Sequence, residues 1–326
     1  MALIMRQRLL IGGKILHKIS EAELVSGRKE PHSQLTIKLP KMKGYDNKAF
    51  KKGDLVRWWA WYEGYKESLE FEGKVVSISP KMPLEMMPLE IVCRDGMYDL
   101  QLKTVNFNID KMTIPLIVNR CISAENVIPK IDPTVASMRL SYDILTAGKR
   151  AAFVLHRLKK YGIDAFFRNS FLIVQNPTRI SAPKEKKIFQ LGHNVIKDNL
   201  STRENRPIKV KLRSYNIDTG RMQEATYTER GGEELVFDLD GISYSELKKR
   251  AKEIYHEIAG TGLVGDFETF GAPSVQHSEI ITFKDPDDKD RSKDIFVDKV
   301  VKTWSAKNAT FRQIIHPAVV KFQDAR

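Results

Sequence analysis

Two scarcities limit the chemistry that this sequence of 326 residues supports. Only two cysteines are present, Cys93 and Cys121, and no histidine follows either of them at the spacing of a metal ligand. That pattern excludes a disulfide framework and a zinc knuckle, and it is typical of a reducing compartment. The seven histidines lie apart, without an HExxH pair, and no Gly-x-Ser-x-Gly elbow supplies a nucleophile. We therefore expect no catalytic residues, no metal and no cofactor.

Long apolar runs are also missing. No stretch approaches the roughly 18 to 20 uninterrupted apolar residues of a membrane-spanning helix, and one of the longest candidates, Thr113 to Val118, is strand-sized. The first residues, Met1 to Gly13, carry Arg6 and Arg8 but too few apolar residues for a secretory segment. We expect no membrane anchor and no secretion signal, with synthesis in the cytoplasm.

Acidic residues are fewer than basic ones, 41 against 54, so the formal net charge is +13. Such an excess favours nucleic acid, acidic proteins or anionic surfaces as partners. The basic residues are spread from Lys14 to Lys302 and form no single tract. An ordinary solvated surface and a functional basic face both remain open.

What the sequence has in abundance is short apolar segments separated by Gly, Pro, Asn and Asp. The clearest are the hairpin of Asp54 to Tyr62 with Leu69 to Ile78, followed by a strand at Leu89 to Arg94. This pattern continues to about Val127 and predicts an all-β unit, a barrel or a sandwich.

The pattern changes after this unit. Apolar residues from Ile144 to Leu158 recur at helical spacing and Gly162 ends the helix, after which two short strands flank the turn 168–170. A polar linker spans 176–187. The last third is again strand-rich, and Ser243 with Glu246 forms a capping box for an inserted helix near 243–259.

The resulting prediction is a β-rich α+β protein in which two β-barrel domains flank a small α/β domain. The expected boundaries are 1–127 for the first barrel, 128–206 for the α/β domain and 207–326 for the second barrel with its inserted helix.

Three segments imitate functional motifs. Gly260 to Gly265 matches the glycine pattern of dinucleotide sites, but a helix precedes it where a strand is required, so we expect a helix-exit turn. The acidic run Asp285 to Asp290 lacks the glycine and glutamate of an EF-hand and is interpreted as a hairpin loop. Asp266 and Glu268 form a carboxylate pair without an evident second role.

The aromatic residues gather at Trp58, Trp59, Trp61, Tyr62 and Tyr65. Strand alternation places Trp58 and Tyr62 on one face and Trp59 and Trp61 on the other, which divides any platform for stacking bases or sugars. One set is expected in the barrel core. The other, Trp59 and Trp61 with Tyr65, is a candidate subunit or domain interface, with a place in the core left open.

Several patterns together resemble the phage late-control protein D and tail baseplate hub family, which is related to the hub part of VgrG-type spikes. They run from the first strands, through the α/β piece, to the glycines near 270, and comprise Gly53 to Tyr62, Phe71 to Val75, Leu89 to Leu100, Ala151 to Gly162, Phe167, Gly262, Gly265, Thr269, Phe270, Gly271, Pro273 and Val275. One departure is Ser278-Glu279, where such hubs often carry Gly-Asp.

The resemblance implies a homotrimer whose two barrels per subunit form a ring of six similar domains, joining a tail tube to a spike protein. The implied location is a virion tail or injection particle assembled from protein made in bacterial cytoplasm. DNA passing through a basic lumen is a further implied partner.

Two other functions remain open at this stage. The charge and the tryptophans also suit a nucleic-acid-binding protein with an OB-like barrel. A cell-wall hydrolase would have to use scattered carboxylates such as Asp266 and Glu268.

Overall fold

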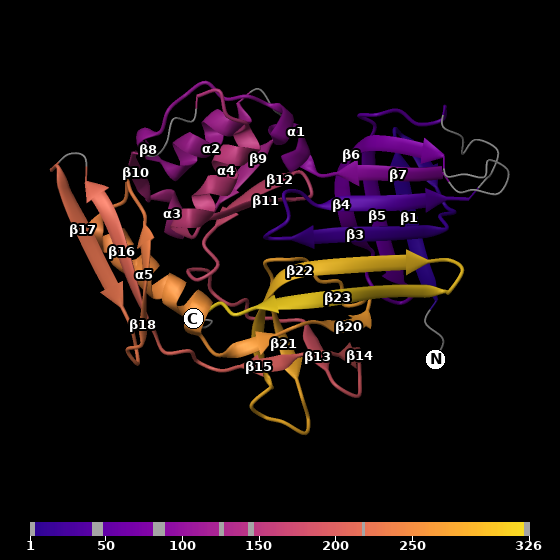
Figure 1. The fold of residues 1–326 in the computed structure, drawn as a ribbon. Coiled ribbons are helices and arrows are strands. Elements are labelled where there is room, and N and C mark those ends of the chain that lie inside the picture. The colour runs from indigo at the N-terminus through magenta and orange to yellow at the C-terminus, as the bar shows by residue number, and fades with distance from the viewer. Residues whose placement is uncertain are drawn as a thin grey trace.

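The structure of the chain, a computed structural model, describes residues 4–40, 48–80, 89–123, 127–142, 147–216 and 219–322. The fold is β-rich α+β, with large antiparallel sheets (Figure 1). Among these residues, no helix has both the length and the apolar character needed to cross a membrane.

The N-terminal region is made of strands, and its alternating apolar residues explain them. In β4 and β7 every second side chain is buried, which is the pattern of a sheet with one face on a core. The predicted hairpin is confirmed as β5 paired antiparallel with β6, and the predicted third strand is β7. The seven strands are β1 (Met5–Ile11), β2 (Lys14–Leu16), β3 (Glu21–Gly27), β4 (Gln34–Leu39), β5 (Leu55–Tyr62), β6 (Ser68–Pro80) and β7 (Leu89–Arg94).

An α/β region follows directly after β7. The predicted strand pair around the turn 168–170 is confirmed as β11 and β12. Gly162 ends the preceding helical segment with a φ of 79°, a left-handed conformation that glycine adopts at little cost. The elements are α1 (Gly96–Leu102), β8 (Asp110–Thr113), α2 (Ile114–Ile122), β9 (Ile128–Ile131), α3 (Pro133–Ala136), β10 (Arg139–Tyr142), α4 (Ala151–Arg157), the 3-10 helix η1 (Leu158–Tyr161), β11 (Asp164–Arg168) and β12 (Phe171–Gln175).

Two predictions in this region are wrong. The all-β pattern expected up to about Val127 ends at Arg94, because Asp95 caps α1 by accepting from the backbone N–H of Met97. The apolar run after Thr113 is helical, since Pro115 suits a first turn and the buried residues of α2 recur at helical spacing.

The helix predicted from Ile144 is shorter than expected. Ile144 itself lies outside the described residues, and 147–149 form a turn, so α4 begins at Ala151.

A second small sheet with one long helix completes this part of the molecule. The parallel and antiparallel neighbours of β16 (Ile208–Asn216) are β18 (Glu233–Asp238) and β17 (Arg221–Tyr227). The predicted helix is confirmed as α5 (Tyr244–Ala259), and the Ser243 side chain accepts from the Glu246 N–H as the capping box requires. Gly260 ends it, and a strand follows, so the glycine pattern is a helix exit.

The last region contains the remaining strands. Its predicted hairpin around Asp285 to Asp290 is confirmed, because β21 and β22 pair antiparallel on either side. The strands are β13 (Ile188–Gln190), β14 (Val195–Asp198), β15 (Ser201–Arg203), β19 (Gly262–Val264), β20 (Phe267–Phe270), β21 (Ile280–Lys284), β22 (Lys293–Ser305) and β23 (Thr310–Ala318).

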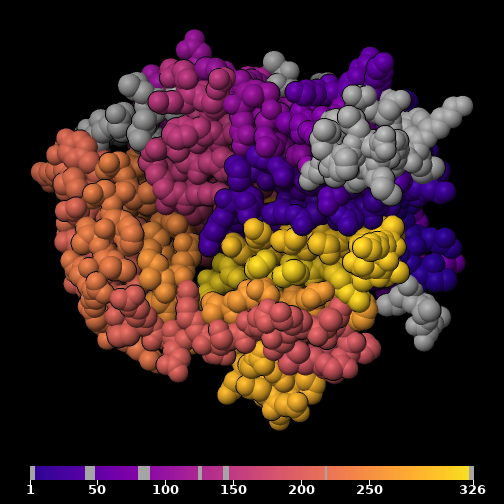
Figure 2. Space-filling model, turned by 45° about the vertical axis from the view of Figure 1, so that its right-hand side comes forward, coloured from indigo at the N-terminus to yellow at the C-terminus, as the bar shows by residue number. Residues whose placement is uncertain are grey.

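The first and last regions share one sheet. Strand β22 pairs with β3 from Lys299 to Ser305, so the sheet runs in the order β14-β20-β23-β22-β3-β4-β7-β6-β5-β1-β2. Figures 1 and 2 show the yellow β22 and β23 lying directly against the indigo N-terminal strands. The predicted count of two barrels stays a prediction, since these strands form one continuous sheet.

The hydrophobic cores cross the expected domain boundaries. One core takes in Met97 to Val174 and also Ile208 to Ala259, which joins α5 and its sheet to the α/β region. The core of the first seven strands also contains Trp304 and Phe311, from the far end of the β22–β23 hairpin. The boundaries at 127 and 206 therefore stay predictions, and the packing favours a division near residue 95.

We expect Phe311→Ala to destabilise the N-terminal strands, which lie far away in the sequence. Phe311 is fully buried, with its ring centroid 6.3 Å from that of Trp58, so the cavity costs about 3 to 5 kcal/mol. Urea unfolding followed by tryptophan fluorescence measures this. The exposed Lys307→Ala in the same hairpin is the control, with a change within about 0.5 kcal/mol. An unchanged midpoint for Phe311→Ala would contradict the shared core.

Candidate assembly surface and the polar contacts behind it

Strand β5 divides its aromatic residues between two environments, as the alternation predicted. Trp58 is fully buried and Tyr62 nearly so, and the Tyr62 hydroxyl donates to the carbonyl of Phe311. These two residues belong to the core. They also tie β5 to the C-terminal hairpin.

The candidate interface residues lie on the outside. The Arg8 guanidinium stands 4.3 Å from the ring centroid of Trp59, and Trp61 pairs in register with Arg6 on β1. Tyr65 is 55% exposed in the turn after β5. Trp59 and Trp61 share one outer face and Tyr65 lies beyond its end, so their role as an interface stays a prediction.

Elsewhere in the molecule, three regions meet at a largely buried ion cluster. Arg28 follows β3, and its Nε lies 2.5 Å from a carboxylate oxygen of Asp164 on β11. Its Nη1 lies 3.5 Å from Asp298 on β22. These partners are 136 and 270 residues away in the sequence, so no local pattern could reveal them. The cluster fixes the three regions relative to one another.

A second polar contact lies nearby, between β22 and β6. Lys302 is 2% exposed and forms an ion pair with Glu70, and it also donates to the hydroxyl of Ser274. The sequence of β22 does not indicate that Lys302 is buried or that its partner is Glu70. Because removing one member of a buried pair leaves an uncompensated charge, such a contact enforces one arrangement of the strands.

His277 occupies the same junction. Its Nδ1 lies 2.6 Å from the Ser26 hydroxyl, and its ring packs edge-on against Phe166. Burial, and then the nearby Arg168 guanidinium, lower the pKa of His277 to about 3. The imidazole therefore remains neutral in the folded protein under all ordinary conditions.

The departure from the hub pattern, a serine in place of a glycine, lies at Ser278, the residue after His277. Ser278 has a φ of 62°, a left-handed conformation in which glycine is favoured. Its backbone N–H donates to the carbonyl of Val297 at 2.7 Å. The backbone thus keeps the conformation that a glycine would adopt, although the residue is a serine.

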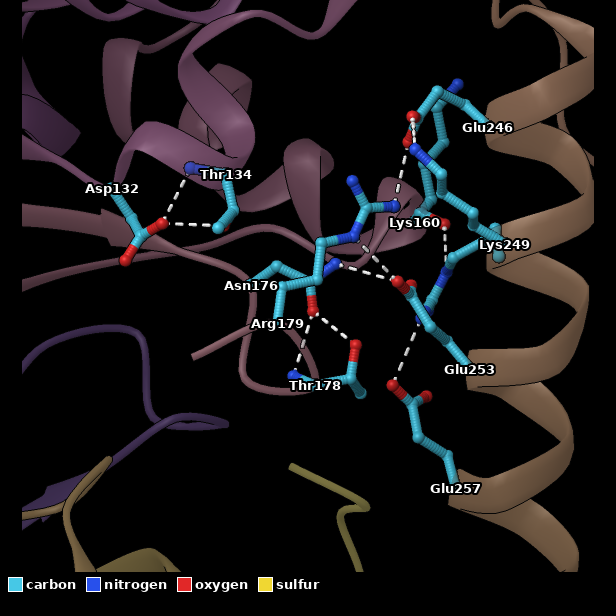
Figure 3. Close-up of polar contacts among 11 residues, drawn as sticks. Asp132, Thr134, Lys160, Asn176, Thr178, Arg179, Glu246, Lys249, Glu253 and Glu257 are labelled. Atoms are coloured by element: carbon cyan, nitrogen blue, oxygen red, sulfur yellow. Dashed lines mark hydrogen bonds and ion pairs between the residues drawn. The ribbon is translucent and has the colours of Figure 1, made fainter. Parts of the chain in front are cut away.

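A third polar cluster, the α5 ion cluster, connects α5 with the predicted linker (Figure 3). It consists of three cationic and three acidic side chains, Arg179, Lys249, Arg250, Glu246, Glu253 and Glu257. Arg179 reaches Glu246 at 2.8 Å and Glu253 at 2.9 Å, and the Asn176 amide donates to Glu253 at 3.2 Å. The linker is therefore held against α5.

Asp266 and Glu268 are both half-buried on either side of the buried Phe267, and each has a partner of its own. Asp266 accepts from the side chain of Asn199, whereas Glu268 lies 3.9 Å from Arg312. Over the described ranges, no group of three or more His, Cys, Asp or Glu is arranged to hold a metal ion.

The fold has close counterparts among solved structures, although no protein-family profile and no curated protein matches the sequence. The 43 kDa tail protein of prophage MuSo2 from Shewanella oneidensis aligns over 98% of this chain and 99% of its own, with a TM-score of 0.70 and 14% identity. A tail protein from Neisseria meningitidis aligns over 96% of both chains, with a TM-score of 0.69 and 14% identity.

A third counterpart comes from a secretion machine. An Escherichia coli component of the type VI secretion system, described as structurally similar to the bacteriophage T4 tail proteins gp27 and gp5, aligns over 98% of this chain and 79% of its own. Its TM-score is 0.64 and its identity 10%. The chain therefore has the fold of these phage-tail and secretion-system proteins.

We expect Arg179→Met to lower the free energy of unfolding by about 2 kcal/mol or more, because it leaves the largely buried Glu253 short of a partner. Lys249→Met is the matched control. Its ammonium also pairs with Glu246 but is 59% exposed, so the loss stays within about 0.5 kcal/mol. Urea denaturation of both variants measures the difference. Equal losses would show that burial of the cluster is not what matters.

We expect His277 to make the protein less stable as the pH falls. The unfolded histidine binds a proton below about pH 6.5, while the folded one stays neutral down to about pH 3. Stability is then lost by up to about 1.4 kcal/mol per pH unit in that window. Asp95, whose pKa burial raises to about 6, acts in the opposite sense, because its folded form takes up a proton first.

The contribution of His277 is therefore measured as the difference in free energy of unfolding between two proteins. The free energies of unfolding of the protein with His277 and of its His277→Asn variant are compared at pH 7, 6, 5 and 4. Because hydrogen bonds through Ser33 and Ser26 connect Asp95 with His277, both proteins carry Asp95→Asn, so that the difference isolates the histidine. The advantage of the protein with His277 should shrink toward low pH, and a constant difference would show that His277 titrates normally.

Proposed function

We propose that this chain is a structural baseplate hub protein of a phage tail or a phage-tail-like injection machine. The observation that carries the proposal is the alignment with a prophage tail protein over 98% of this chain and 99% of the other. Because the alignment covers nearly the whole of both chains, the likeness to a phage tail protein extends over the full described fold and is not limited to one domain.

In this role the chain forms a homotrimeric ring that joins a tail tube protein to a spike protein, inside a virion tail or injection particle. The function is mechanical and not enzymatic. The shared sheet and the buried ion clusters support it, since they hold three regions as one body on which subunit contacts are built. The same proposal includes DNA that passes through the ring. The net charge of +13 supports this part, because an excess of basic residues attracts a polyanion.

The nucleic-acid-binding alternative receives less support from the aromatic residues. Trp58 is buried, and the Trp59 ring is covered by the Arg8 guanidinium, which is itself paired with Glu67. Strand β5 therefore lacks the row of exposed rings on which successive bases would stack.

We expect the purified protein to have a mass of about 112 kDa by light scattering, three times the 37.4 kDa of the chain. Trp61→Glu should shift it toward the monomer, because a charge at an interface core opposes burial. The far-UV circular dichroism spectrum should remain unchanged, since Trp61 lies outside the core of the subunit. Tyr244→Glu, an exposed aromatic residue on α5, is the control and should leave the trimer intact.

The outcomes separate two claims. A trimer that survives Trp61→Glu contradicts the interface assignment alone. A wild type that remains monomeric contradicts the trimer.

A further inference from the structure

A groove beside α5 borders the α5 ion cluster, and three members of that cluster, Arg179, Lys249 and Glu253, line it. Two cavities, of about 480 and 340 Å³, lie on either side of the chain that follows β23. They share His256 of α5 with Lys321 and Phe322. The shared residues make the two cavities neighbours, and the larger one borders α5 from Lys249 to His256.

The charge along this groove is positive. The α5 ion cluster, which borders it, is internally balanced, with three cations against three carboxylates. Lys252 and Lys321 line the larger cavity. In the described part of the chain neither has a carboxylate partner, and Lys252 only approaches the ring of Tyr227 at 5.9 Å. Two uncompensated ammonium groups therefore face the groove.

The same cavity is lined by a buried polar side chain without a hydrogen-bond partner. His256 is 8% exposed, and its Nε2 has no hydrogen bond to any described residue. The nearest carboxylate, that of Glu229, is 3.9 Å away, beyond hydrogen-bond range. Burial is the main cause that lowers the pKa of His256, and the positive charge of Lys321 lowers it further. The Glu229 carboxylate raises this pKa, whereas Lys252 adds a smaller lowering effect. The imidazole is thus neutral near pH 7 and, with its proton on Nε2, has a donor without a partner beside the groove.

We propose that this groove binds an extended acidic segment of a partner protein, with one Asp or Glu carboxylate held between Lys252 and Lys321 and hydrogen-bonded by His256. The walls suit a peptide, since Val319, Val320 and Phe322 offer apolar surface beside the polar groups. They suit nucleic acid less well, because Glu229 and Asp294 in the smaller cavity would repel a continuous run of phosphates, whereas a peptide with a single carboxylate in the larger cavity places no negative charge beside them. The site does not depend on the proposed ring, because every group in it belongs to one chain.

The experiment is a selection from a random dodecapeptide display library on the purified protein, followed by fluorescence anisotropy with the recovered peptides. We expect those peptides to share one acidic residue flanked by apolar ones. Replacing that residue by its amide should weaken binding about tenfold or more, as should Lys252→Glu or Lys321→Glu in the protein. Solution mass, which reports assembly, should not change in either variant.

Lys248→Glu is the matched control, because it makes the same charge change on the same helix while its ammonium stacks on Tyr244. It should leave peptide affinity within about twofold. His256→Ala should weaken binding, and His256→Gln, which keeps a donor, should restore most of it.

Three results would overturn the proposal. The first is that the selected peptides share no acidic residue. The second is that Lys248→Glu and Lys252→Glu weaken peptide binding equally. The third is that binding of a labelled oligothymidine depends on Lys252 while peptide binding does not. The last would make the groove a nucleic-acid site.

Discussion

The pairing of β22 with β3 is the contact on which the rest of the structure depends. It makes one sheet of strands from opposite ends of the chain, and it places the β22–β23 hairpin in two cores at once. Trp304 and Phe311 pack among the N-terminal strands, whereas Val297 and Ile315 pack in the C-terminal region. A slip of one residue would turn each of these side chains to the opposite face. The ion pair of Lys302 with Glu70 favours this register, because a slip of one residue would turn the Lys302 ammonium to the other face and leave the Glu70 carboxylate buried alone.

Local features were predictable from the sequence, and long-range ones were not. Three predicted features depend on residues only a few positions apart, so a short window of sequence is enough to predict each of them. These are the β5–β6 hairpin, the β11–β12 turn and the capped start of α5. The helices α1 and α2 were missed because short apolar runs suit strand and helix equally until a cap such as Asp95 is recognised. The sharing of β22 and the partners of Arg28 and Lys302 depend on contacts between distant segments. A strand pattern does not specify which sheet it joins.

The same distinction applies to function. The +13 charge invited a nucleic-acid partner, yet several of the basic side chains bind carboxylates of the same chain, among them Arg28, Arg179 and Lys302. These ion pairs connect regions of the chain, so the charges that form them are not available to a polyanion. The aromatic residues divide in the same way, with Trp58 and Tyr62 in the core and Trp59 and Trp61 outside. The composition was thus informative about assembly only after the fold had separated internal from external groups.

Class averages from electron microscopy of the purified protein test the central claim most directly, because the proposal concerns a shape. The account predicts a closed ring with threefold symmetry and a pseudo-sixfold outline, in which each subunit contributes two similar lobes joined along β22 and β3. Particles without a closed ring, or a ring in which the two lobes of a subunit sit in variable orientations, would contradict it.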